Sequence, residues 1–122
     1  MTRTILIVDD SITLRQVVAI ALSDAGYQVV EAGDGKEGLT KLDAHKVQLI
    51  ISDVNMPVMD GIAFLKAIKQ RPDYKFTPVI ILTTENAQAK MQEGQAAGAR
   101  AWVVKPFQPA QMLSAVAKLI QA

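Results

Sequence analysis

The sequence predicts an α/β fold with a parallel sheet that is covered by helices on both faces. Short apolar runs rich in Val and Ile alternate five times with segments whose apolar residues recur every three or four positions. Three of these runs are apolar almost throughout, as strands are when both of their faces are buried. The chain has 122 residues, half of them hydrophobic, so we expect one domain spanning residues 1–122.

The expected strands fall into two groups. The three nearly continuous apolar runs are residues 4–8 (TILIV), 47–52 (VQLIIS) and 78–83 (PVIILT). The two runs with more polar residues, typical of strands at the edges of a sheet, are residues 28–32 (QVVEA) and 101–105 (AWVVK). A strand followed by a helix five times implies parallel strands joined by right-handed crossovers.

The first expected helix ends before Gly26, because glycine is typical of the position that follows a helix. Its buried face is predicted to carry Leu14, Val17, Val18, Ala21, Leu22 and Ala25. The other helices are expected at residues 35–44, around residues 64–68 with an end near Arg71, at residues 86–97, and from Pro109 onward.

The fourth expected helix is the one that we predict to be locally mobile. Its apolar residues are mostly alanine, and burial stabilises by only about 25 cal/mol per Å² of apolar surface. Alanine side chains therefore anchor this helix weakly compared with the Leu and Ile side chains of the other helices.

Composition excludes several classes of protein. The net charge is +1, from 13 basic and 12 acidic residues, which gives no electrostatic signal for nucleic acid or for an anionic membrane surface. The chain has no cysteine, so disulfides and thiol redox chemistry are absent. It also lacks a signal peptide and the run of about 20 apolar residues that a membrane span needs. We expect a cytoplasmic protein with no appended output domain.

Polar side chains stand at the ends of four of the expected strands. Asp9 and Asp10 follow the first strand, Asp53 follows the third, Thr83 ends the fourth and Lys105 ends the fifth. Because the carboxyl ends of parallel strands lie at the same edge of a sheet, we expect these side chains to meet there.

Three carboxylates in one place imply either a raised pKa of one of them or a bound cation. Two like charges about 4 Å apart repel by roughly 4 kcal/mol at an effective dielectric constant of 20. Oxygen ligands without His or Cys favour Mg²⁺, with Mn²⁺ as the alternative. Mg²⁺ uses one or two carboxylates, which leaves one to act as a nucleophile toward phosphorus. Lys105 and Thr83 would then hold the oxygens of the transferred phosphoryl group.

Four motifs in the same order resemble the receiver domains of two-component response regulators. They are VDDS (8–11), SDVNMPVMDG (52–61), ILTTE (81–85) and VVKPF (103–107). The resemblance covers essentially the whole chain. It implies a flavodoxin-like (βα)5 domain with a five-stranded parallel sheet of order 2-1-3-4-5.

The resemblance also implies roles for individual residues. Asp53 would be the phosphoacceptor, taking a phosphoryl group from the phosphohistidine of a CheA-like histidine kinase. Asp10, Asp53 and the backbone carbonyl of Asn55 would ligate Mg²⁺, and Asp9 would act through a bound water.

The same resemblance assigns the residues that respond to phosphorylation. Lys105 would pair with the phosphate and Thr83 would turn to bond it, while Trp102 occupies the position of the aromatic switch residue. The stretches TTEN (83–86) and RAWVVKPF (100–107) resemble the single-domain CheY-like chemotaxis regulators, which bind the flagellar motor switch. We therefore expect a monomer that signals by protein–protein contact. A phosphate sink or a phosphorelay intermediate is the alternative within the family.

Two other classes of protein fit these residues less well. A small Mg²⁺-dependent phosphohydrolase would carry a second acid two residues beyond the nucleophile, where this chain has Asn55, and it would need space for a cap. A flavodoxin-like FMN binder would need phosphate donors after the first strand, where Asp9 and Asp10 would repel a phosphate. We expect no turnover of an external substrate.

Overall fold

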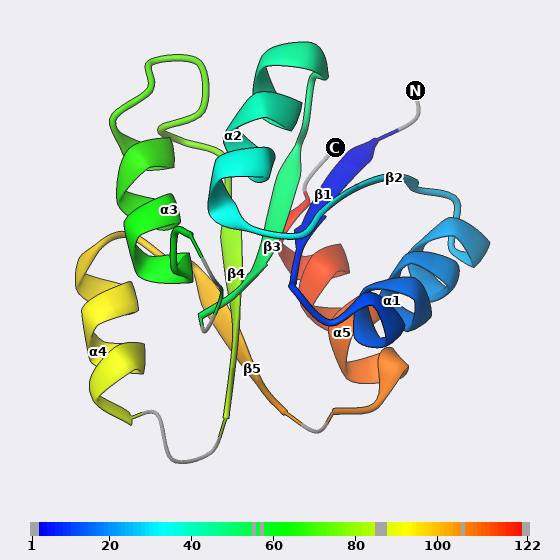
Figure 1. Ribbon diagram of the computed structural model, residues 1–122. Helices are drawn as coiled ribbons and strands as arrows, with labels where there is room; N and C mark the ends of the chain where they lie inside the picture. The colour runs from blue at the N-terminus through cyan, green and yellow to red at the C-terminus, as the bar shows by residue number, and fades with distance from the viewer. Residues whose placement is uncertain (1–2, 55, 57, 85–87, 106, 121–122) are drawn as a thin grey trace.

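A five-stranded parallel sheet forms the centre of the molecule (Figure 1). The computed structural model describes residues 3–54, 56, 58–84, 88–105 and 107–120. The strands are β1 (Thr4–Val8), β2 (Gln28–Ala32), β3 (Leu49–Asp53), β4 (Val79–Thr84) and β5 (Ala101–Lys105). They pair in the order β2-β1-β3-β4-β5, which confirms the expected flavodoxin-like topology and places the two more polar strands at the edges.

Helices cover both faces of this sheet. They are α1 (Ile12–Asp24), α2 (Gly35–Ala44), α3 (Gly61–Lys69), α4 (Gln88–Ala96) and α5 (Pro109–Leu119). Figure 1 shows α1 and α5 on one side of the sheet and α2, α3 and α4 on the other. In the part of the chain that is described, no helix is long and apolar enough to cross a lipid bilayer.

The apolar strands contribute to two hydrophobic layers, one on each side of the sheet. In β1, Ile5 and Ile7 belong to the layer under α1 and α5, whereas Leu6 and Val8 belong to the layer under α2 and α3. All four side chains are fully buried. Successive strand residues point to opposite faces, so a strand covered on both faces must be apolar at every position.

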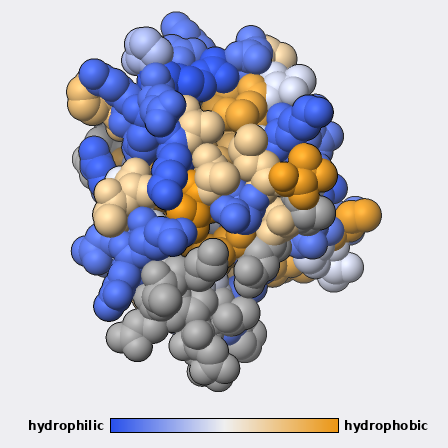
Figure 2. All heavy atoms as spheres, turned by 60° about the vertical axis from the view of Figure 1, so that its left-hand side comes forward, coloured by the Kyte–Doolittle hydropathy of each residue, from blue (hydrophilic) through white to orange (hydrophobic). Residues whose placement is uncertain are grey.

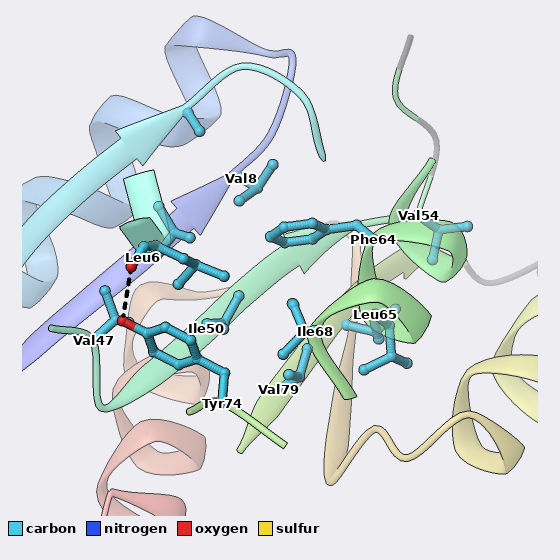
Figure 3. Packing of buried hydrophobic residues seen from close by; sticks show 13 residues of the cluster. Leu6, Val8, Val47, Ile50, Val54, Phe64, Leu65, Ile68, Tyr74 and Val79 are labelled. Atoms are coloured by element: carbon cyan, nitrogen blue, oxygen red, sulfur yellow. Dashed lines mark hydrogen bonds between the residues drawn. The ribbon is translucent and has the colours of Figure 1, made fainter. Parts of the chain in front are cut away.

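The layer under α2 and α3 is closed by two aromatic side chains. Figure 3 shows Phe64 of α3 reaching toward Val8 across the sheet. Gly38 of α2 allows this approach, because a Cβ there would lie 2.8 Å from the Phe64 ring. Tyr74 donates its buried hydroxyl to the Leu42 carbonyl at 3.2 Å, marked in Figure 3, and to the His45 carbonyl at 2.7 Å. These bonds satisfy the phenol inside an apolar layer.

The predicted inward face of α1 was wrong at Val17 and at Ala25, which is exposed and follows the last residue of the helix. Val18 and Leu22 are buried, but the Val17 side chain is 46% exposed. Neighbouring helix residues lie about 100° apart, so only a narrow stripe of α1 reaches the sheet. The outward side of α1 instead carries exposed Ile12 and Ile20.

The boundaries of two strands also differ from expectation, while the limits of α2 match. β4 begins at Val79 rather than residue 78 and continues to Thr84. β3 begins at Leu49 rather than residue 47 and continues to Asp53, which pairs in register with Leu82 of β4. The parallel pairing of β3 with β4 therefore extends to Asp53, the residue that carries the carboxylate. α1 ends at Asp24, and Gly26 follows with φ of +99°, as expected for a helix stop.

The contact of α4 with the rest of the fold depends on small residues. Gly94 is buried, and a Cβ there would lie 3.3 Å from Ile62 Cδ1 of α3. Figure 2 shows this side of the molecule, where hydrophilic residues surround a smaller hydrophobic area. The mobility of α4 stays a prediction.

Candidate functional site

Three carboxylates meet at the carboxyl edge of the sheet. Asp9 and Asp10 follow β1, and Asp53 is the last residue of β3, the strand that pairs with β1. Each of the three offers a carboxylate oxygen, and these oxygens lie within 4.8 Å of one another. Asp9 and Asp53 are buried while Asp10 is exposed, so the cluster extends from the interior of the fold to its surface.

Asp9 is fixed at several atoms. Its N–H donates to the Ala32 carbonyl of β2 at 3.1 Å. Its Oδ1 accepts the Ser11 N–H at 2.8 Å, and its Oδ2 accepts from Lys105 Nζ at 3.2 Å. Ser11 is the residue that caps α1, by accepting the Leu14 N–H at 3.3 Å. Because Ser11 caps the helix, neither Asp9 nor Asp10 is needed as the cap of α1, and both remain available to the acidic site.

Asp53 is held by its own strand and by Lys105. Its Oδ1 accepts the Val54 N–H at 2.9 Å and lies 3.2 Å from Lys105 Nζ. The Ser52 hydroxyl donates to the Asp53 carbonyl at 3.0 Å. Lys105 thus forms ion pairs with both buried carboxylates, Asp9 and Asp53.

The environment of Asp53 favours its protonated form. Burial raises the pKa of the Asp53 carboxyl above 3.8, and the negative charge of Asp9 raises the pKa further. The positive charge and hydrogen bond of Lys105 lower the pKa, as does the Val54 N–H, but these effects are smaller. An additional cation near these oxygens would therefore favour the ionised carboxylate.

The donor set fits a hard divalent cation. The clustered ligands are carboxylate oxygens alone, and the expected ligands Asp10 and Asp53 both belong to the cluster. The third expected ligand, the carbonyl of Asn55, lies outside the described residues. Asp9 already binds Lys105 and the Ser11 N–H, which suits a role through a water better than direct ligation.

The two expected switch residues lie on the neighbouring strands. Thr83 is buried on β4, one residue beyond Leu82, the partner of Asp53 in the sheet. Trp102 is partly buried on β5, pairs in register with Ile81, and packs against the layer under α2 and α3. Thr83 therefore lies on the strand next to Asp53, and Trp102 lies on β5, the edge strand beyond it.

Gly61 supports the site by its close approach to the backbone of β3. Its N–H donates to the Val54 carbonyl at 2.9 Å, and a Cβ at this position would lie 2.0 Å from the Asp53 carbonyl oxygen. Asp60 caps α3 by accepting the Ala63 N–H at 2.8 Å. An Asp before an apolar helix is a sequence signal for the helix cap alone, whereas the close approach of Gly61 to Asp53 depends on how α3 packs against β3.

Comparisons with known proteins agree with this arrangement. The profile of the response regulator receiver domain matches residues 5–117. The chain is 40% identical over 113 residues to the probable chemotaxis protein CheY of Rhizobium etli, covering 92% of this chain and 88% of that protein. It is 39% identical over 107 residues to chemotaxis protein CheY1 of Helicobacter pylori, covering 86% of each.

Solved structures extend the likeness to the whole fold. Chemotaxis protein CheY4 of Vibrio cholerae superposes with a TM-score of 0.93 at 49% identity, over 98% of this chain and 99% of that chain. The strand order, the acidic cluster and the family match lead to one conclusion. The chain belongs to the response regulator receiver domain family of two-component signalling.

Proposed function

We propose that the protein is a phosphoaspartate switch, in which Asp53 accepts a phosphoryl group from the phosphohistidine of a CheA-like histidine kinase. One observation carries this proposal: Lys105 Nζ lies 3.2 Å from both Asp9 and Asp53 within a cluster of three carboxylates. A lone lysine offsets only part of that negative charge. The site is thus suited to a divalent cation and an incoming phosphoryl group.

The transfer step uses the free oxygen of Asp53. Oδ1 is held by the Val54 N–H and by Lys105, which leaves Oδ2 to attack phosphorus. A P–O bond forms while the P–N bond to the kinase histidine breaks, and the electron pair leaves with the imidazole nitrogen. Lys105 is placed to stabilise the negative charge of the transferring group. The raised pKa of Asp53 makes its ionised oxygen a more basic nucleophile.

Mg²⁺ is the proposed cofactor, with Mn²⁺ as a substitute. Asp10, Asp53 and the Asn55 carbonyl would hold the ion, and Asp9 would act through a water. When bound, the ion supplies positive charge that offsets the phosphoryl oxygens. The protein would not turn over an external substrate, because the phosphoryl group remains on its own side chain until hydrolysis.

The proposed output is a change in the surface formed by α4, β5 and α5. Thr83 and Trp102 link the acidic site to β5. An open groove of about 970 Å³ runs between β5 and α5, and its charged lining residues are Arg100, Lys105 and Lys118. This basic lining suits an acidic segment of a partner protein. The named chemotaxis relatives support a role in chemotaxis. The partner in this proposal is the flagellar motor switch, and the protein acts as a monomer in the cytoplasm.

Phosphoryl labelling tests the switch. The purified protein is incubated with a radiolabelled low-molecular-weight phosphodonor, with Mg²⁺ or with EDTA. We expect label in the wild type only with Mg²⁺, and none in Asp53→Asn. Asp24→Asn, an exposed aspartate at the end of α1, is the matched control and should be labelled normally. Absence of label from wild type in Mg²⁺ would contradict the proposal.

A binding experiment separates the motor-switch role from the alternatives. Beryllofluoride with Mg²⁺ mimics the phosphoryl group on an aspartate. We expect the loaded protein, and not the unloaded protein, to bind a purified flagellar motor switch protein. Labelling without such binding would instead favour a phosphate sink or a phosphorelay intermediate.

A further inference from the structure

Arg15 of α1 links three parts of the chain behind the acidic cluster. Its Nη1 donates to the backbone carbonyl of Asp9 at 2.8 Å, and its Nε donates to Glu31 Oε1 at 3.0 Å. Glu31 lies on β2 next to Ala32, the residue whose carbonyl accepts the Asp9 N–H. The Arg15 side chain is only 18% exposed, so the guanidinium is held between helix, loop and strand.

The hydrogen bond to the Asp9 carbonyl bears directly on Asp10. The Asp9 carbonyl and the Asp10 N–H belong to one planar peptide group. A bond that fixes the carbonyl oxygen therefore limits the rotation of that plane, and with it the position of the Asp10 Cα from which the side chain extends. Among the described residues, the Asp10 carboxylate has no hydrogen bond or ion pair of its own. Its place in the cluster depends on its backbone.

We propose that Arg15 is a positioning residue for the metal site: it orients the Asp9–Asp10 peptide so that Asp10 faces Asp53, and Glu31 orients Arg15. This inference rests on the proposed function, because it assigns to Arg15 a role in cation binding at that site. Arg15 itself donates to a carbonyl and a carboxylate, so it acts through Asp10 and does not contact the ion.

The direction in which the affinity for a divalent cation changes distinguishes this positioning role from a purely electrostatic one. A guanidinium beside the site repels a divalent cation, so loss of its charge alone would tighten cation binding. Loss of positioning would weaken binding instead. The double variant Arg15→Gln/Glu31→Gln removes one positive and one negative charge, which leaves the net charge of the chain unchanged and exposes the geometric effect.

A purely structural role makes another distinct prediction. An ion pair that only braces the fold lowers the denaturant concentration at the midpoint of unfolding. It leaves the dissociation constant of the folded protein for a cation unchanged, as long as the variant is folded in the assay. Arg71 offers a matched control, because this residue of the connection between α3 and β4 forms ion pairs with Asp43 of α2 at 2.7 Å and with Asp73 at 3.2 Å.

The experiment measures binding of Mn²⁺ alone, by the electron paramagnetic resonance signal of the free ion. We compare wild type, Arg15→Gln, Arg15→Lys, the double variant and Arg71→Gln, each shown to be folded by urea denaturation. We expect the dissociation constant to rise about tenfold in Arg15→Gln and in the double variant, in the range typical of residues that orient metal ligands. Arg71→Gln should match wild type.

Each contrary result has a definite meaning. An unchanged or tighter constant in both Arg15→Gln and the double variant overturns the positioning role, while labelling of wild type at Asp53 leaves the proposed function intact. Failure of the wild type to bind Mn²⁺ overturns the proposed function and this inference together. If Arg15→Gln does not fold, Arg15→Lys is measured instead, because lysine keeps the charge but lacks the planar fork. A higher dissociation constant for Mn²⁺ than in wild type supports the positioning role, and an unchanged constant overturns it.

Discussion

Lys105 Nζ lies 3.2 Å from Asp53 Oδ1, although Lys105 ends the edge strand β5 and Asp53 ends β3, two strands away. The lysine side chain therefore passes the end of β4 to reach the acidic cluster. It lies the same distance from Asp9 Oδ2. The ammonium group of Lys105 thus pairs with two buried carboxylates. Substitution of Lys105 is therefore the most direct test of the electrostatics of the site.

Replacement of Lys105 by methionine should slow phosphorylation of Asp53 about 100-fold, because the charge that faces the transferring phosphoryl group is lost. The measurement is the initial rate of label incorporation in Mg²⁺. Lys46→Met, at an exposed lysine before β3, should incorporate label at the wild-type rate. A Lys105→Met rate equal to wild type would remove Lys105 from the mechanism.

The raised pKa of Asp53 predicts a pH-dependent gain in stability for Asp53→Asn. Between pH 3.8 and the higher folded-state pKa, the folded protein binds more protons at Asp53 than the unfolded chain. The stabilising contribution of this proton is therefore present below pH 3.8 and is lost as the pH rises through the folded-state pKa. Asparagine stays neutral, so Asp53→Asn should be more stable than wild type at pH 7.

Urea denaturation in EDTA measures this difference at pH 7 and at pH 3.5. The acidic groups that do not interact with Asp53 are common to both proteins, so their contributions cancel in the comparison. We expect the stability advantage of Asp53→Asn to shrink at the lower pH. An advantage that is equal at both values, or that is reversed, would show that the charge of Asp53 does not destabilise the fold.

Trp102 is the single tryptophan of the chain and should report the proposed switch by its fluorescence. The indole is partly buried in this structure. Beryllofluoride with Mg²⁺ should move its emission maximum to shorter wavelength as the indole becomes more buried. Thr83→Val keeps the shape of the side chain but removes its hydroxyl, and it should abolish this spectral change. A full spectral response in Thr83→Val would separate Thr83 from the motion of Trp102.

Substitution of Gly61 by alanine should destabilise the protein by about 3 kcal/mol or more, since the new Cβ would lie 2.0 Å from the Asp53 carbonyl oxygen. Relief of that clash requires movement of the backbone that carries the phosphoacceptor. Gly33→Ala is the control, because its Cβ would make only ordinary contacts at 3.5 Å. Similar urea midpoints for the two variants would contradict this explanation.

Backbone amides of α4 should exchange hydrogen roughly tenfold faster than those of α1. α1 buries Val18 and Leu22, whereas Gly94 is the only fully buried residue among residues 91–96 of α4. Hydrogen exchange followed by mass spectrometry gives both rates in one experiment. Equal protection of the two helices would mean that contacts other than apolar burial hold α4.

Much of the fold could be predicted because its signals are local. The continuous apolar runs in β1, β3 and β4 indicated strands buried on both faces, and α2 lies where the spacing placed it. The carboxylates at the ends of β1 and β3 could be predicted to meet, since parallel strands share one carboxyl edge. The order of the strands required the resemblance to receiver domains, because no local pattern states which strands are neighbours.

The sequence by itself determined the alternation of strands and helices and the residues at the carboxyl edge of the sheet. Only the tertiary structure decided the contacts of Arg15 with Asp9 and Glu31 and the approach of Gly61 to Asp53. The tertiary structure also left Val17 exposed. Helical and strand periods act over a few residues, whereas these contacts depend on how whole elements pack. That packing minimises apolar exposure across the entire chain at once.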